Sequence, residues 1–234
     1  VVASPSSSRM HVYLADALWT HERPDEALSS LQTALQLSPG YDWAWRCLRT
    51  WSKHLGRGEL LEQTAREVAR QKPGVAHSWY YLAMTLWDPG EKLEALDKAI
   101  ECNPDYIAAY EEKIETLVQH ERFNDARQVI TDYDRGYGIP LGLRRYAPWM
   151  DYRRGEIDKA IIDLKALLEE EPGYYNGWDM LAAWCENNER PGDFLIASRQ
   201  LVKLQPDNGD AWVRLGDALL MNDEREEAKK ALQQ

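Results

Sequence analysis

Residues 212–232 read WVRLGDALLMNDEREEAKKAL, and this stretch decides the fold. Its apolar and small residues recur three and four positions apart, at Trp212, Leu215, Gly216, Leu219, Ala228 and Leu232. Such spacing places them on one face of a helix, so the stretch predicts two amphipathic helices joined by a short turn. One hairpin cannot bury its own apolar face, which implies neighbouring hairpins of the same kind.

The same pattern recurs along the chain at a fixed period. Trp-x-x-Leu occurs at Trp45, Trp79, Trp178 and Trp212, and proline follows helix-like runs at Pro39, Pro73, Pro104, Pro172 and Pro206. The prolines are separated by 34, 31, 68 and 34 residues, and 68 is twice 34. A period of this length indicates a stacked repeat array with one shortened unit. The predicted units are 8–41, 42–75, 76–106, 107–140, 141–174, 175–208 and a partial unit from 209.

This pattern resembles the tetratricopeptide repeat, whose signature is W-x-x-L-G-x-x-Y, then A-x-x-x-F, then a proline. The first unit is similar, with His11, Leu14, Ala15, Leu18, Ala27, Leu31 and Pro39 at the corresponding places. The resemblance implies an all-α, right-handed solenoid of about seven helical hairpins over residues 8–234. Residues 1–7 are expected to form a disordered or tag-like lead. The missing initiator methionine and the helical pattern at the C-terminus suggest a piece of a longer protein.

The register gives testable element and core positions. We expect first helices near 9–21, 43–55, 76–87, 107–120, 143–154, 175–187 and 209–221. We expect these side chains to be largely buried: Leu14, Ala27, Trp45, Leu48, Trp79, Leu82, Ala160, Trp178, Leu181, Trp212 and Leu215.

Three units depart from the pattern. The third lost three residues around 87–91, which predicts a tight turn. The fifth carries Pro148 in mid-helix, which predicts that its first helix begins late, near Ala147, or is kinked. The sixth has Phe194 where alanine is expected.

The composition narrows the class of partner. The net charge is −11, from 39 acidic and 28 basic residues, and an acidic surface repels phosphate, so we expect no nucleic-acid ligand. No apolar run approaches the ~20 residues that span a membrane, so we expect no membrane insertion. Cys47, Cys102 and Cys185 form no C-x-x-C pair, which argues against a disulfide framework and a zinc site.

Catalytic motifs are missing from the sequence. His21-Glu22 and His120-Glu121 lack the second histidine of H-E-x-x-H, and no phosphate-binding or nucleophile-elbow motif occurs. We therefore expect no enzyme activity, no metal site and no cofactor.

The resemblance also implies where a ligand binds, because in this family positions 2, 5, 9, 12 and 13 of each first helix line an inner groove. Aromatic and charged residues at those positions are the types that dominate binding hot spots. The candidate ligand-binding residues are Trp19, Trp43, Arg46, Lys53, His54, His77, Tyr80, Met84, Trp87, Glu111, Arg145, Trp149, Tyr152 and Arg153. An alternative interpretation is that the extra tryptophans fill imperfect packing between units.

The function predicted from these features is binding of another protein or peptide through an aromatic groove of mixed charge. The carboxylate clamp of the family is missing, because Lys and Asn do not occupy its positions. An alternative is that the array is a non-catalytic segment of a larger enzyme that positions a polypeptide or sugar. A weaker alternative is a likeness to the helical subunit of protein prenyltransferases. The cytoplasm is the default expectation for the compartment, and the oligomeric state stays open.

Overall fold

The computed structural model describes residues 7–138 and 140–234, and every regular element in them is a helix. The lead predicted for residues 1–7 lies outside the described residues, apart from Ser7. The fold is an all-α solenoid of helical hairpins, as the sequence predicts. The chain divides into two compact units, Val1–Tyr137 and Gly138–Gln234, called unit 1 and unit 2 below. The division falls between the fourth and fifth predicted repeats.

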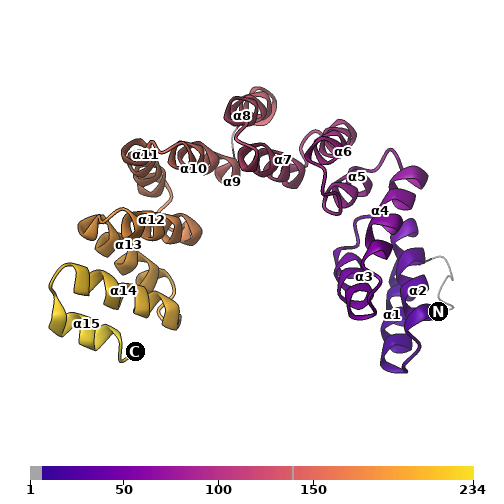
Figure 1. Ribbon diagram of the computed structural model, residues 1–234, viewed down its shortest axis with the longest axis horizontal. Coiled ribbons are helices and arrows are strands. Elements are labelled where there is room, and N and C mark those ends of the chain that lie inside the picture. The colour runs from indigo at the N-terminus through magenta and orange to yellow at the C-terminus, as the bar shows by residue number, and fades with distance from the viewer. Residues whose placement is uncertain (1–6, 139) are drawn as a thin grey trace. The chain divides into compact units, whose positions relative to one another are not determined.

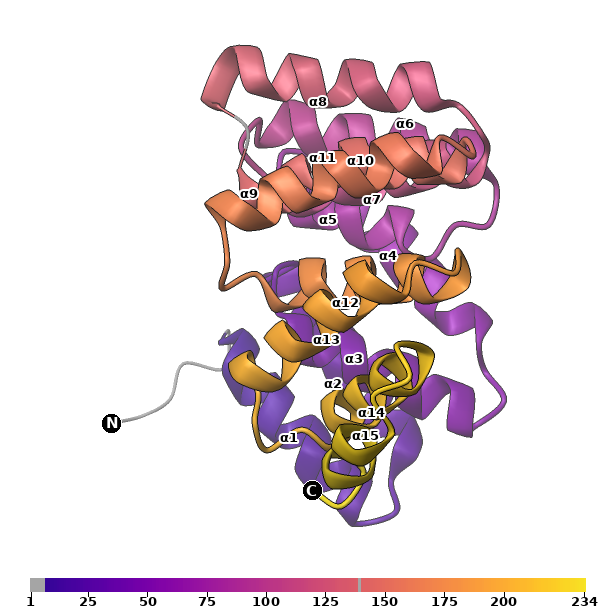
Figure 2. The ribbon, with the colours of Figure 1, turned by 90° about the vertical axis from the view of Figure 1, so that its left-hand side faces the viewer.

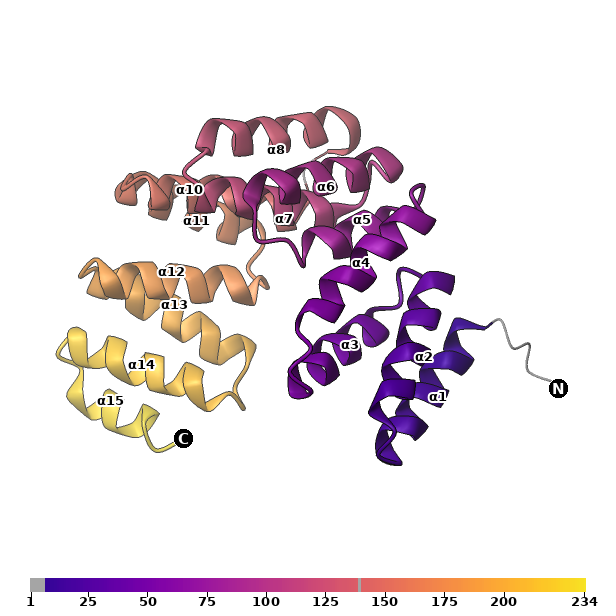
Figure 3. The same ribbon diagram turned by 45° about the vertical axis from the view of Figure 1, so that its right-hand side comes forward.

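Unit 1 contains four successive hairpins (Figures 1 and 3). Each hairpin pairs a first helix with the second helix that follows it, and α2, α4 and α6 also pack on the next first helix. The helices are α1 (Ser8–Thr20), α2 (Pro24–Leu37), α3 (Asp42–His54), α4 (Glu59–Gln71), α5 (Ala76–Ala83), α6 (Pro89–Cys102), α7 (Ile107–Gln119) and α8 (Phe123–Tyr137).

Unit 2 continues the same construction with an interrupted first helix (Figure 2). Its helices are α9 (Leu141–Arg144), α10 (Tyr146–Arg153), α11 (Ile157–Glu170), α12 (Tyr175–Asn187), α13 (Pro191–Leu204), α14 (Gly209–Met221) and α15 (Arg225–Ala231). Pro148 lies in the first turn of α10. A backbone N–H at this place has no acceptor within the helix, so a proline, which lacks the N–H, removes no helical hydrogen bond there. The predicted disturbance of this helix is observed as a break at Arg145, because α9 precedes it and α10 begins at Tyr146.

The turn inside a hairpin ends its first helix with one residue at positive φ. In six hairpins that residue is Glu22, Gly56, Glu121, Gly155, Glu189 or Asp223. The next N–H then reaches back to a carbonyl of the first helix, as Arg23 N–H does to Leu18 O at 2.9 Å. This is the hydrogen-bond pattern of a left-handed helix cap, and it fixes where each second helix starts.

A hydrogen bond joins each motif tryptophan to the linker before its hairpin. The indole N–H of Trp45 donates to Pro39 O at 2.8 Å. The same bond, always to the proline six residues earlier, is made by Trp79, Trp178 and Trp212. In the fourth unit the Tyr110 hydroxyl donates to Pro104 O at 3.0 Å. The paired spacing of tryptophan and proline in the sequence therefore reflects one contact between linker and helix.

Most of the predicted core is confirmed, and one residue is wrong. Leu48 and Ala160 are fully buried, and Phe194, which departs from the expected alanine, is also fully buried. Leu14 was expected to be buried, but it is 48% exposed. The equivalent residues Leu48 and Leu82 are buried on helices that pack on a preceding hairpin, whereas no hairpin precedes α1 in the described residues. Trp79 and Trp212 are only partly buried.

The predicted bounds of the first helices are also largely confirmed. Most observed ends fall within one or two residues of the prediction. The third unit differs, because α5 ends at Ala83 instead of extending to residue 87. The deletion in this unit therefore shortens the first helix and does not act only on the turn after it.

Candidate functional site

A hollow of about 420 Å³ lies between the first helices α3 and α5 of unit 1. It brings together three residues that the sequence proposed for binding, Arg46, Tyr80 and Met84. Asp42, Trp45, Arg49 and Tyr81 complete its lining. Arg46 and Arg49 are exposed, and their guanidinium groups make no ion pair with any residue that the structure describes. Two open cations beside tyrosine rings can receive an anionic group.

Aromatic stacking holds the floor of this hollow in place. Trp45 and Tyr81 are stacked with their ring centroids 4.7 Å apart, and Tyr80 meets Tyr106 at 5.3 Å. His77 packs against the same Tyr106 ring at 4.8 Å. The Tyr81 hydroxyl donates a hydrogen bond to Asp42, and burial followed by this bond raises the pKa of Tyr81. Tyr81 therefore stays a neutral donor, and its ring is fixed.

Carboxylates from α7 lie on the far side of Tyr80. Burial raises the pKa of Tyr80, and the negative charges of Glu112, Asp42, Glu111 and Glu115 raise it further. Glu112 is paired with Lys92 of α6, and both of these side chains are mostly buried. The face formed by α3, α5 and α7, called the groove face below, therefore changes from basic at α3 to acidic at α7.

A larger hollow of about 730 Å³ adjoins the first, because Met84 lines both. It is bounded by the start of α4, the segment after α5 and the end of α7. Trp87, proposed from the register as a groove residue, lines this hollow and is 96% exposed. It lies beyond the end of α5, so the helical register does not govern its direction.

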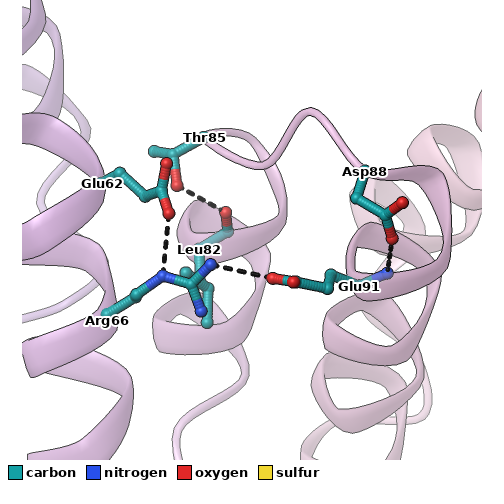
Figure 4. A network of polar contacts seen from close by, with 6 residues as sticks. All are labelled: Glu62, Arg66, Leu82, Thr85, Asp88 and Glu91. Carbon is teal, nitrogen blue, oxygen red and sulfur yellow. Dashed lines mark hydrogen bonds and ion pairs between the residues drawn. The ribbon is translucent and has the colours of Figure 1, made fainter. Parts of the chain in front are cut away.

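Polar contacts fix the segment that follows α5 (Figure 4). The Arg66 guanidinium of α4 donates to Glu62 and to Glu91 of α6, each at 2.8 Å, and so ties α4 to α6. Asp88 caps α6 by accepting from the Glu91 N–H at 2.8 Å. Thr85 donates its hydroxyl to the Leu82 carbonyl at 2.7 Å. The shortened turn is therefore an ordered structure.

Aromatic side chains of α1 and α3 form a separate cluster. Trp19 stacks on the buried Trp51 with ring centroids 4.4 Å apart, and Trp43 meets Trp51 edge-on at 6.2 Å. Exposed His54 lies at the edge of Trp19, 6.1 Å away. Both Trp19 and Trp43 are partly buried against the core, and Lys53 is exposed. Much of the area of these two tryptophans therefore serves packing between hairpins.

The four proposed residues of unit 2 form their own group. Arg145 donates to the Tyr146 hydroxyl at 2.9 Å, and Trp149 packs against Tyr146 at 5.7 Å. Tyr152 stacks on Trp184 of α12 at 4.3 Å, and Arg153 is exposed. The Tyr152–Trp184 stack repeats the contact that Trp19 makes with Trp51 in unit 1. Contact with the core makes Trp149 and Tyr152 partly structural as well.

Two further features, a metal site and a membrane-spanning helix, were considered for the described residues. Among residues 7–138 and 140–234, no cluster of histidine, cysteine and carboxylate side chains could hold a metal ion. Within the same residues, no helix has the length and apolar character needed to cross a membrane.

Comparison with known proteins finds a sequence match at the start of the chain. A family model described as the tetratricopeptide repeat matches residues 1–42. This match covers the first hairpin of the array. No curated protein matches the array in sequence.

Solved structures with this fold extend the likeness over the whole array. A tetratricopeptide repeat protein from Parabacteroides merdae aligns with a TM-score of 0.62 at 15% identity, over 96% of this chain and 91% of the other. Yeast Tom70 aligns with a TM-score of 0.68 at 15% identity, over 96% of this chain and 50% of Tom70. The human IFIT1 dimer with PPP-AAAA aligns with a TM-score of 0.51 at 16% identity, over 97% and 67%. Tetratricopeptide arrays are generally non-catalytic scaffolds for protein interaction.

Sequence reasoning missed several residues that line the two hollows of unit 1. Arg49 and Tyr81 line the smaller hollow beside Arg46 and Tyr80, although their register positions are not among the inner ones of the family. Glu59 and His120 line the larger hollow, at the turn ends of their hairpins. The three-residue deletion was the available signal for the larger hollow, since a shortened helix leaves space beside its neighbours.

Proposed function

We propose that unit 1 binds an extended peptide segment of another protein along the groove face. The observation that carries this proposal is the hollow between α3 and α5, where unpaired Arg46 and Arg49 stand beside the Tyr80 ring. Arginine and tyrosine are the residue types that most often dominate interfaces, because they bury large areas and lose little entropy. An acidic side chain of the peptide fits the α3 end of the groove face, where these two arginines lie.

The dimensions and charges favour a peptide over other ligands. A hollow of about 420 Å³ accommodates one or two side chains, and the larger hollow of about 730 Å³ continues it at Met84. Two adjoining hollows along one face fit an extended chain, whose alternate side chains point in the same direction. The change from arginine on α3 to carboxylates on α7 sets the direction in which a charged peptide lies.

The net charge of the chain argues against nucleic acid as an alternative ligand. Human IFIT1 has a similar fold and was solved with PPP-AAAA, so the fold itself admits ligands of that kind. This chain carries a net charge of −11, and the glutamates beside Tyr80 add negative charge to the groove face. Phosphate groups are repelled by such a surface. A peptide of mixed charge therefore fits the groove face better.

Selection from a random peptide library displayed on phage tests the proposal directly. We expect enriched peptides that contain acidic residues, and we expect Arg46→Glu and Tyr80→Ala each to weaken their binding by about 10-fold or more, the effect of an interface hot spot. Lys72→Glu is the matched control, because it makes the same charge change at an exposed lysine at the end of α4. Its effect on affinity should stay within about twofold.

Two results would contradict the proposal. One is a selection that enriches no peptide above the background of an empty support. The other is a set of enriched peptides whose affinity responds equally to Arg46→Glu and Lys72→Glu, since that would place binding outside the groove face. Circular dichroism of each variant shows whether the fold is retained.

A further inference from the structure

The shortened third hairpin leaves a notch in unit 1. Helix α5 has 8 residues, whereas α3 and α7 on either side have 13 each. At a rise of 1.5 Å per residue, α5 stops about 7.5 Å short of its neighbours. The hollow of about 730 Å³ lies at this end, between the start of α4 and the end of α7. We call it the notch.

The apolar part of the notch comes from the segment that replaces the missing helical turn. Met84, Leu86 and Trp87 line it from this segment, and Leu61 lines it from α4. Met84 and Leu86 are partly buried, whereas Trp87 is 96% exposed. A large aromatic side chain left almost wholly in water loses the stabilisation that burial would give it. Packing against the described residues therefore gives Trp87 almost no burial.

Glu59, Glu62 and Lys92 are the charged side chains that line the notch, where His120 also lies, and one of the three has no ion-pair partner among the described residues. Lys92 is neutralised by Glu112, and Glu62 is paired with Arg66. Glu59, at the start of α4, is exposed and makes no ion pair with any described residue. The notch therefore combines an unpaired carboxylate, an exposed indole and an apolar floor.

We propose that the notch receives a lysine or arginine side chain of the partner polypeptide. A cation gains from the face of an indole ring and from a carboxylate, and its aliphatic stem can lie on Met84 and Leu86. The notch favours a positively charged side chain, because the Glu59 carboxylate is negative and the exposed Trp87 ring attracts cations. The inference rests on the proposed function for the identity of the partner, and it adds the side-chain class that one subsite recognises.

The test uses the full 234-residue chain labelled with 5-fluorotryptophan, with the Trp87 resonance assigned by Trp87→Phe. The probes are the tripeptides acetyl-Gly-Lys-Gly-amide and acetyl-Gly-norleucine-Gly-amide, which differ in the ammonium group. We expect a saturable shift of the Trp87 resonance with the lysine peptide. The norleucine peptide should bind at least about 5-fold more weakly, the loss expected when a cation–π contact and an ion pair are both removed.

A charge variant separates recognition from simple electrostatic attraction. Glu59→Gln should weaken binding of the lysine peptide by about 3-fold or more, consistent with the loss of one partly screened ion pair. Glu101→Gln removes one negative charge from an exposed position on α6 outside the notch lining, and it should leave the affinity unchanged. Equal effects of the two variants would overturn the role of Glu59.

The inference fails if the Trp87 resonance does not shift, or if the norleucine peptide shifts it equally, which would make the notch a purely apolar pocket. The proposed function fails by a different result. In that case, phage selection yields no peptide sensitive to Arg46→Glu. The two failures can be told apart, because Arg46 does not line the notch and Glu59 does not line the hollow between α3 and α5.

Discussion

The bond between tryptophan and proline can be measured on a single helix. Trp178 and Trp184 both lie on α12, with exposures of 8% and 6%. The Trp178 indole N–H donates to Pro172 O at 2.9 Å. The Trp184 indole N–H makes no hydrogen bond with any described residue, and its ring instead stacks on Tyr152. Phenylalanine at either position removes the same part of the indole ring.

Both substitutions should therefore lose similar packing, and only Trp178→Phe should also lose a hydrogen bond. We expect about 1–2 kcal/mol from lost burial in each variant. Trp178→Phe should cost about 1 kcal/mol more, at the usual net value of a hydrogen bond, because exposed Pro172 can still reach water. Urea unfolding followed by far-ultraviolet circular dichroism measures the difference. If the two variants have equal stability at equal denaturant dependence, the bond does not stabilise the array.

Three further outcomes follow from the same structure. Gly56 has φ of 70°, so Gly56→Ala should lower the free energy of unfolding by about 1 kcal/mol, whereas Gly58→Ala, at a helical φ, should not lower it. Burial raises the pKa of the Cys185 thiol from 9.0 to about 11, because the folded chain favours the neutral thiol. The stabilisation that this neutral thiol gives the fold is therefore fully present below pH 9.0 and is lost as the pH rises toward 11. At pH 8 Cys185 should react with a thiol reagent far more slowly than partly exposed Cys102, as mass spectrometry of the labelled chain would show. Trp87→Ala should change thermal stability by less than about 0.5 kcal/mol, because the ring is 96% exposed.

The elements of this fold could be predicted because their signals are local. Helical periodicity and the proline of each linker both act over the length of one hairpin. Leu14 shows where local reasoning stops, because its burial depends on whether a hairpin precedes α1. The sequence also presented tryptophan and proline as two separate periodic signals. Only the structure shows that Trp45 and Pro39 are bonded to each other.

The candidate site was predictable in part for a related reason. The repeat register assigned Arg46 and Tyr80 to one surface, and both line one hollow in the structure, because both lie on intact helical turns. It could not place Trp87, because the deletion ends α5 before that residue is reached. It also omitted Arg49, since a rule about which side of a helix faces inward says nothing about how far a long side chain extends along the surface.

The position of the deletion explains how a repeat array can form an additional hollow at little cost to its stability. The residues that pack α5 between its neighbours, such as Leu82 and Ala83, lie before the shortened end and remain buried. The residues lost belong to the turn end of the hairpin, where a helix has fewer packing partners. Glu62, Arg66 and Glu91 then tie α4 to α6 across the gap with exposed ion pairs, each of small energetic value. Irregularity is therefore tolerated at the turn ends of a solenoid more readily than in its interior, and a hollow with its own lining can form there.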